Sequence, residues 1–179
     1  NKDAWEVYFH QYKQIPQYKI LNFNMTLEQF KIIFYWEYFH RFIARLIGLF
    51  FLFPLVYFYF SKCINKEYIR ICYLIFALIV LQGAIGWYMV ESGLVNNITV
   101  SHYRLSIHLF TAILIISTIF WLINNIISKQ NKNFFKLSRN NFPFQIFILL
   151  IFIQIIIGAF VSGLDAGRIY QTWPMMDET

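Results

Sequence analysis

The sequence has little charge and long apolar runs. Only 13% of its 179 residues are Asp, Glu, Lys or Arg, whereas 59% are hydrophobic. A soluble domain usually carries about 25% charged residues, so this composition excludes an ordinary soluble protein. Most of the apolar residues fall in four runs, at about residues 32–60, 71–90, 103–127 and 144–163.

Each apolar run has roughly the 20 residues that an α-helix needs to cross the hydrocarbon core of a bilayer. Helices fit better than strands, because backbone groups in lipid must be hydrogen-bonded within their own segment. The sequence therefore predicts an all-α, polytopic transmembrane bundle with four spanning helices. Thr26-Leu27-Glu28-Gln29 matches a capping box and predicts the start of the first helix, and Pro54 predicts a kink within it.

Cysteine is scarce too, with Cys63 and Cys72 alone and no Cys-x-x-Cys pair. This excludes a zinc knuckle or a thioredoxin-type centre and favours two free thiols near a membrane surface. The chain begins with Asn1, shows no signal-peptide pattern and stops in a polar segment. We expect both ends to be cut rather than native.

The net charge of +6 lies mainly in loops, which is a topology signal and not a nucleic-acid footprint, so no nucleic-acid partner is expected. By the positive-inside rule, the loops after the first and third runs face the cytoplasm or the mitochondrial matrix. Residues 1–25, the 91–101 turn and the C-terminal tail then share the outer side. The basic residues of the two loops are Lys62, Lys66 and Arg70, and Lys129, Lys132, Lys136 and Arg139.

Two histidines are the main candidates for chemistry. If the first and third helices enter the membrane near Ile32 and Ser101, His40 and His108 lie ~10–12 Å below the outer surface. Ionisable residues at such depth usually face a bundle interior, where two imidazoles can hold one haem iron. Small residues beside them leave room for a flat macrocycle: Ala44, Gly48 and Ala112. The alternative is an interhelical hydrogen bond between the histidines.

Charged neighbours extend this candidate site. Arg41, Arg45 and Arg104 can anchor haem propionates, or can reach the membrane interface instead. Glu37 shares a helix face with His40 and can orient it, act as a base or stabilise positive charge. The alternative for Glu37 is an interfacial ion pair with Arg41.

Other polar and small residues favour structural roles. His102 is expected to be a cap or surface residue, and His10 to be solvated. The Asp165-Ala166-Gly167 turn is expected to end a helix. Four glycines are expected to be close-packing positions: Gly83, Gly86, Gly158 and Gly163.

Taken together, these motifs resemble the haem A synthase family of bacteria and mitochondria. EYFHRFIARLIG at residues 37–48 is similar to the family's E-x-x-H-R helix, and VSHYRLSIHL at residues 100–109 to its fourth helix. LQGAIGWYMVESGL (81–94) and GAFVSGLDAG (158–167) are similar to the ends of its third and fifth helices. The outer segment at residues 25–30 fits the mitochondrial and α-proteobacterial branch.

The resemblance implies an eight-helix fold in two four-helix halves, each with a histidine pair. This chain would then hold family helices two to five. Residues 1–31 would form an outer loop with a short helix, 32–127 three helices of the N-terminal half, and 128–142 an inner basic loop. Residues 143–179 would form the first helix of the C-terminal half and the outer loop after it.

The resemblance also implies an activity: oxidation of the C8 methyl of haem O to a formyl group, with water as the oxygen source. The product, haem A, serves cytochrome c oxidase. His40 and His108 would be the iron-ligating pair, Glu37 the catalytic acidic residue, and a haem b would occupy the other half. Haem O synthase and oxidase assembly factors are expected partners besides lipid. Some members carry a cysteine pair in the first outer loop, which this sequence lacks.

The family's location is the mitochondrial inner membrane or the bacterial plasma membrane, with this histidine pair toward the outer side. Two other readings of the same residues stay open. One is a cytochrome b-like electron carrier that uses the same histidines as haem ligands. The other is a transporter or assembly factor whose histidines bind no haem.

Overall fold

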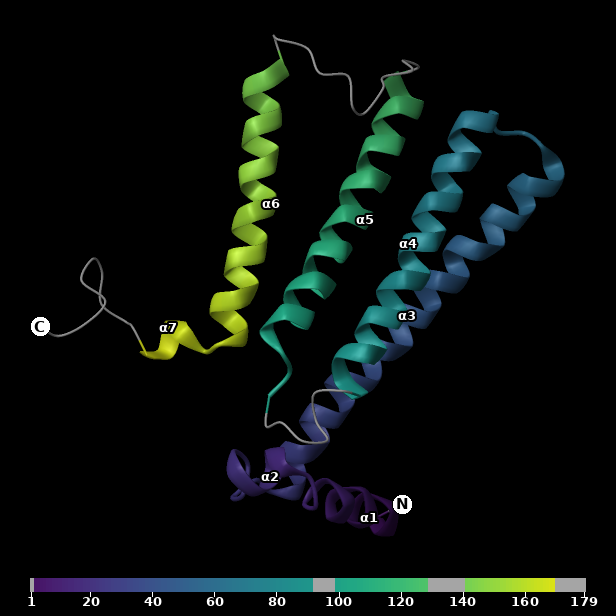
Figure 1. The fold of residues 1–179 in the computed structure, drawn as a ribbon. Helices are drawn as coiled ribbons and strands as arrows, with labels where there is room; N and C mark the ends of the chain where they lie inside the picture. The colour runs from purple at the N-terminus through teal and green to yellow at the C-terminus, as the bar shows by residue number, and fades with distance from the viewer. Residues whose placement is uncertain (1, 92–98, 129–140, 170–179) are drawn as a thin grey trace, which may run out of the picture. The chain divides into compact units, whose positions relative to one another are not determined.

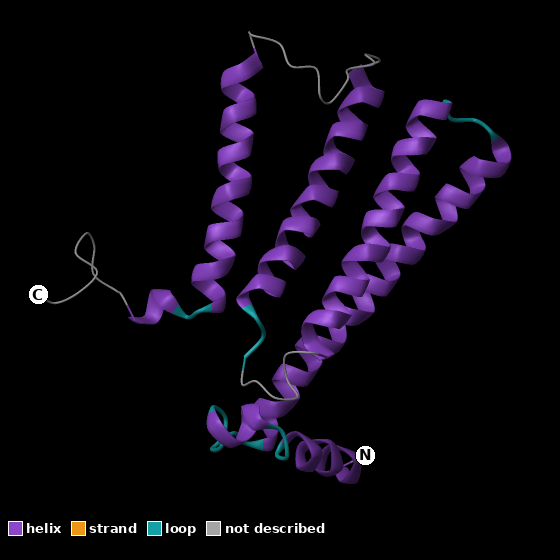
Figure 2. Ribbon diagram, viewed as in Figure 1, coloured by secondary structure: helices purple, strands orange, loops and turns teal. Residues whose placement is uncertain are grey.

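The computed structural model describes residues 2–91, 99–128 and 141–169, and the regular elements in these ranges are all helices (Figure 2). Four of them are long and apolar enough to cross a membrane: α3 (Leu27–Ser61), α4 (Lys66–Glu91), α5 (His102–Ser128) and α6 (Phe142–Gly163). The predicted all-α fold with four candidate spans is confirmed. The helices begin before their apolar runs, because polar first turns such as Lys66-Glu67 are also helical.

The described chain forms two compact units, residues 1–100 and residues 101–179, and each is described by itself. In the first unit α3 and α4 form a helical hairpin (Figure 1). Phe51 of α3 stacks on Phe76 of α4 with 6.4 Å between ring centroids, and the neighbouring Ile75 is fully buried. Lys62 ends α3 in the left-handed conformation, with φ of 52°.

The start of α3 carries the predicted capping box. The Thr26 backbone N–H donates to Gln29 Oε1 at 2.9 Å, and the Gln29 N–H donates to Thr26 Oγ1 at 3.4 Å. These bonds satisfy N–H groups that have no partner within the helix. The helix then runs without a break through Pro54 to Ser61.

Two short helices, α1 (Lys2–Tyr12) and α2 (Pro16–Ile20), lie at the N-terminal end of α3, far from the α3–α4 loop (Figure 1). The sequence predicted a loop with one short helix here. Aromatic rings attach α1 to α3: Trp5 lies 5.0 Å from Phe34, and Tyr12 lies 5.0 Å from Phe30 between ring centroids. Phe30 is therefore only 6% exposed.

The second unit contains α5, α6 and the single-turn helix α7 (Ala166–Ile169). Helices α5 and α6 pack along each other, with Phe110 and Phe152 in edge-to-face contact at 5.5 Å. Asp165 takes the left-handed conformation, and its carbonyl accepts a 2.9 Å hydrogen bond from the Arg168 N–H. Helix α6 ends at Gly163, just before Asp165, and the predicted turn is in part helical, because Ala166 and Gly167 belong to α7.

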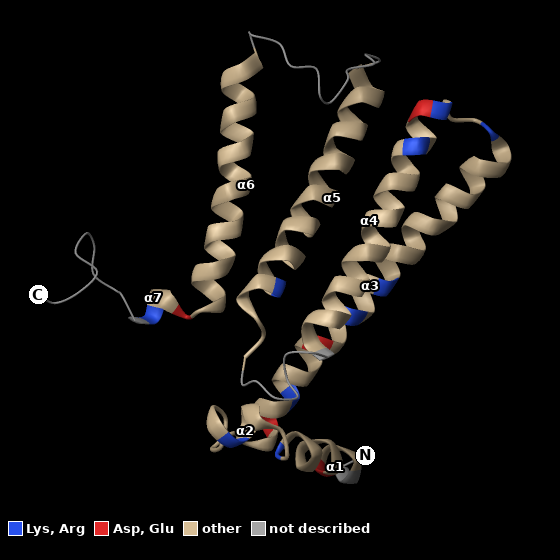
Figure 3. Cartoon of the chain, viewed as in Figure 1, with Lys and Arg blue, Asp and Glu red and all other residues tan. Residues whose placement is uncertain are grey.

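Most large apolar side chains of the four long helices are exposed in the described structure. Such surface suits lipid and not water, and the chain is an integral membrane protein. In the first unit, Lys62, Lys66 and Arg70 gather at the α3–α4 loop (Figure 3). The second predicted basic loop, residues 129–140, lies outside the described residues, and the side of the membrane that either loop faces stays a prediction.

Candidate functional site

One lengthwise stripe of α3 carries Glu37 and Arg41. Its residues alternate in steps of three and four, so they share one helix face. We call it the α3 stripe; it consists of Phe30, Phe34, Glu37, Arg41, Ala44, Gly48, Phe51 and Leu55. The stripe is aromatic or aliphatic at both ends and polar or small in the middle. This pattern could have been read from the sequence, but the motif-based prediction missed it.

The two ends of the α3 stripe are covered and its middle is open. Phe30 is buried beneath α1, and Leu55, one turn beyond the Phe51–Phe76 stack, is only 5% exposed. Between them, Ala44 is exposed, and a Cβ built on Gly48 would meet no atom of the described residues within 4 Å. The first unit therefore leaves a gap on α3, lined by the small residues Ala44 and Gly48 and, nearer the N-terminus of α3, by the charged residues Glu37 and Arg41.

Glu37 and Arg41 form an ion pair in this gap. The distance from Arg41 Nη2 to Glu37 Oε2 is 2.7 Å, and the side chains are 53% and 57% exposed, Arg41 first. This is the pairing that the sequence offered as the alternative to a catalytic role. An exposed pair at i, i+4 contributes only about 0–1 kcal/mol. The pair thus holds both groups over the gap while leaving them accessible.

His40 and Arg45 flank the α3 stripe. His40 lies three residues after Glu37 and four before Ala44, and its side chain is exposed. Arg45 is exposed as well, and it makes no ion pair with any residue that the structure describes. Both side chains can therefore reach a ligand placed over the middle of α3.

Helix α5 carries a second stripe with the same spacing, which begins with Arg104 and His108. We call it the α5 stripe; it consists of Arg104, His108, Thr111, Ile115, Thr118, Leu122 and Asn125. His108 is half-buried, and its Nδ1 atom is shielded from solvent. The hydroxyls of Thr111 and Thr118 donate to the carbonyls of Ile107 and Leu114, both at 2.7 Å. These two hydroxyls therefore bond their own helix.

His40 belongs to the first compact unit and His108 to the second. The predicted meeting of these two histidines at one depth in the membrane would bring the two units together, and it stays a prediction. Among the described residues, no three or more His, Cys, Asp or Glu side chains gather as a metal-ion site. Axial ligation of haem iron needs only two side chains, so the predicted pair does not depend on such a cluster.

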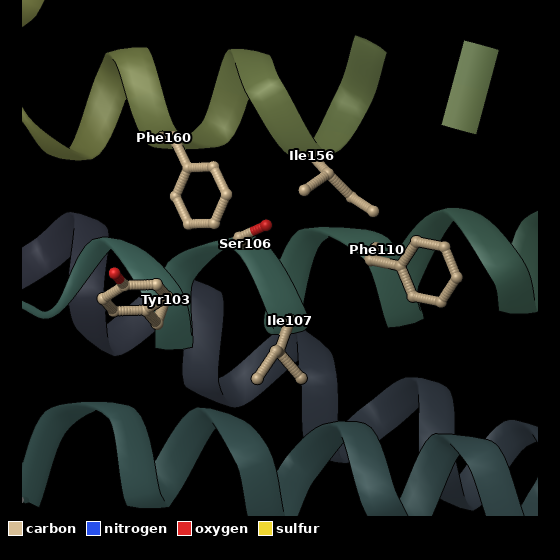
Figure 4. A pocket seen from close by; sticks show the side chains of 6 residues that line it. All are labelled: Tyr103, Ser106, Ile107, Phe110, Ile156 and Phe160. Carbon is tan, nitrogen blue, oxygen red and sulfur yellow. The ribbon is translucent and has the colours of Figure 1, made fainter. Parts of the chain in front are cut away.

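A groove that the sequence did not predict runs between α5 and α6. It has a volume of about 220 Å³ and is lined almost entirely by apolar atoms (Figure 4). The buried Ser106 lies on its α5 wall, and its lining is completed by Tyr103, Ile107, Phe110, Ile156 and Phe160. None of the predicted site residues contributes to this groove.

The glycines divide between packed and open positions. A Cβ on Gly163 would lie 2.8 Å from His102 Cβ and 2.9 Å from His102 Cα, so this glycine permits close approach of α5 and α6, as predicted. At Gly83 and Gly158, no described atom lies within 4 Å of an added Cβ, so the described residues show no close packing there. No described contact tests Gly86.

The remaining histidines and the two cysteines belong to neither the α3 stripe nor the α5 stripe. His102 is half-buried, with its ring 5.6 Å from that of Phe160, so it packs on α6 instead of being a cap or surface residue as predicted. His10 is exposed, as predicted. Cys63 and Cys72 are free thiols, and Cys63 Sγ lies 3.1 Å from Ser61 Oγ.

The chain matches known proteins along its whole length. The family described as cytochrome oxidase assembly protein (COX15-CtaA) matches residues 1–179. The chain is 52% identical to a heme A synthase of Pelagibacter ubique over 99% of this chain and 52% of that protein. It is 45% identical to a heme A synthase of Nitrosomonas eutropha, over 98% of this chain and 50% of that protein.

A third relative, a heme A synthase of Bradyrhizobium diazoefficiens, is 43% identical over 97% of this chain and 48% of its own length. The chain thus spans about half the length of the curated relatives it matches. No solved structure matches it. The predicted resemblance to the haem A synthases is confirmed, and this chain belongs to the COX15-CtaA family of cytochrome oxidase assembly proteins.

Proposed function

We propose that this chain carries the substrate site of a haem A synthase. The reaction oxidises the C8 methyl of haem O to a formyl group and so makes haem A for cytochrome c oxidase. The observation that carries the proposal is the identity of 40–52% to relatives named heme A synthase over nearly the whole chain. The open middle of the α3 stripe offers a location for the substrate on this chain.

His40 and His108 are the proposed axial ligands of the substrate iron. Each lies next to charged residues in the N-terminal half of a long apolar helix, His40 beside Glu37 and Arg41, His108 one turn after Arg104. Ala44 and the open space at Gly48 leave room beside His40 for a flat ring system. The donor set suits haem, because neutral imidazoles are its common axial ligands.

The three arginines are proposed to hold the propionates. Arg45 is the first candidate, since it is exposed and has no ion pair within the described residues. Arg41 and Arg104 are the other two, on the α3 and α5 stripes. Arginine suits this role because its planar guanidinium binds a carboxylate through two parallel hydrogen bonds.

Glu37 is the proposed catalytic residue. Glu37 lies one helical turn before His40. Its carboxylate accepts a 2.7 Å hydrogen bond from the Arg41 guanidinium at the edge of the gap. From there it can accept a proton that leaves the oxidised carbon or stabilise positive charge developing on it. The electrons leave to an acceptor outside this chain, and we propose a haem b in the other half of the protein as the carrier.

Replacement of Glu37 tests this function. In the full-length protein, Glu37→Gln should abolish conversion of haem O while leaving bound haem unchanged. Glu28→Gln is the matched control, because Glu28 lies on the same helix in a comparable ion pair, 2.6 Å from Lys31 Nζ. Extracted haems are separated by chromatography. Normal haem A formation by Glu37→Gln would overturn the catalytic role of Glu37.

The membrane location and the partners of the protein are proposed together with its function. The histidine pair would lie toward the outer side of a bacterial plasma membrane or a mitochondrial inner membrane. Haem O synthase would deliver the substrate, and oxidase assembly factors would receive the product. If the protein binds haem through His40 and His108 but never converts haem O, the cytochrome b-like carrier would be the correct function instead.

A further inference from the structure

The segment before α3 is firmly attached to the outer turns of that helix. Trp5 contacts Phe34 and Tyr35 at 5.0 and 5.4 Å, and Phe9 and Tyr12 contact Phe30 at 5.3 and 5.0 Å between ring centroids. Asn22 Nδ2 donates to the Tyr12 hydroxyl at 2.8 Å, which ties the end of α2 back to α1. The level of α1 and α2 along α3 is therefore fixed by these contacts.

That level falls in the headgroup layer of a bilayer. The 35 residues of α3 are ~52 Å long, whereas the hydrocarbon core of a bilayer is about 30 Å thick, so ~15 residues of α3 extend beyond the core. With basic Lys62 and Lys66 at the far end, most of this excess lies in the first turns of α3, which then pass through the headgroup layer. Trp36, next to the α1 contact at Tyr35, is 75% exposed, as is typical of a tryptophan at a membrane interface.

At this level the segment exposes an apolar tip, which we define as Ile20, Leu21 and Phe23. Their side chains are 56%, 53% and 62% exposed, in that order. Asn22 lies between them and bonds inward to Tyr12. Lys19, next to the tip, and Lys13, whose Nζ lies 4.3 Å above the Phe9 ring, are exposed cations. Apolar side chains flanked by lysines fit a lipid surface better than water.

We infer that the apolar tip inserts into the outer leaflet of the membrane and that α1 and α2 act as an interfacial anchor for the start of α3. The occupant of this surface is lipid, with its acyl chains around Ile20, Leu21 and Phe23 and its phosphates near Lys13 and Lys19. Through the aromatic contacts, this anchor then fixes the depth in the membrane of the α3 turns that precede Glu37 and His40. This inference does not depend on the enzymatic activity.

Depth-dependent quenching tests the anchor. In a cysteine-free full-length protein, Phe23→Cys is labelled with an environment-sensitive fluorophore and reconstituted into phosphatidylcholine–phosphatidylglycerol vesicles. Gln11→Cys is the matched control, because Gln11 is an exposed polar residue of α1 in the same segment. Lipids with a nitroxide near the headgroup should quench the label at position 23 at least twofold more than the label at position 11. Aqueous iodide should show the opposite order.

Two results would overturn the inference. Equal iodide quenching at both positions, with little quenching by the nitroxide lipids, would place the tip in water. Protection of position 23 from both quenchers would mean that another protein segment covers the tip. Each labelled protein should unfold at the same temperature as the unlabelled protein, which keeps a folding defect separate from either outcome.

Discussion

Gly163 is the position where the structure predicts the sharpest effect of adding a single methyl group. In Gly163→Ala the new Cβ would lie 2.8 Å from His102 Cβ and 2.9 Å from His102 Cα. Carbon atoms pack best at about 3.5–4.0 Å, so α5 and α6 must separate by ~1 Å or shift along each other. Because one of the opposing atoms belongs to the backbone, no rotamer change can relieve the overlap.

The expected cost is that of overpacking, about 1–3 kcal/mol. Gly158→Ala is the control, because its Cβ would meet nothing within 4 Å in the same helix. That variant should be neutral or gain up to about 1 kcal/mol from helix propensity. The two alanine variants should therefore differ by roughly 1–4 kcal/mol in the free energy of unfolding.

Thermal unfolding of the full-length protein in detergent, followed by circular dichroism, measures the difference. Gly163→Ala should melt several degrees below Gly158→Ala. The double variant His102→Ala with Gly163→Ala should not recover, since Cα and Cβ of residue 102 remain. Equal melting temperatures for the two glycine variants would refute the close packing of α5 on α6.

Two further predictions concern α3. Thr26→Ala removes the capping box and should lower the stability of the first turn of α3 by about 1 kcal/mol. Hydrogen exchange of the first-turn amides should therefore be roughly fivefold faster. Unchanged exchange would contradict the role of the cap. Gly48→Leu fills the open middle of the α3 stripe and should lower bound haem severalfold without a loss of folded protein. Gly83→Leu, at an equally open position on α4, should leave bound haem unchanged, and equal effects of the two leucines would argue against a site at Gly48.

Much of the fold follows from local sequence features. The four spans are long apolar runs, and backbone hydrogen bonding in lipid allows only helices for them. The start of α3 was predicted to the residue, because the Thr26–Gln29 capping box depends on neighbours three positions apart. The two helices before α3 were harder to predict, since their aromatic residues serve contacts with Phe30 and Phe34.

The site was predictable in its residue types but not in its surroundings. The spacing of Glu37 and Arg41 allowed both an ion pair and separate roles, and the structure has the ion pair. Which glycine faces a neighbouring helix depends on rotation about the helix axis, so Gly163 is tightly packed while Gly158 is open. The groove beside Ser106 needs Ile156 and Phe160 at one height on α6, which no pattern within a single helix specifies.

The shared ligation of one haem by His40 and His108 is the central claim, and electron paramagnetic resonance of the full-length protein tests it most directly. His40→Gly and His108→Gly should each remove the same low-spin signal, and added imidazole should restore that signal in both. His102→Gly should retain it, because His102 packs on Phe160. Persistence of every low-spin signal in either His40→Gly or His108→Gly would contradict the proposed pair.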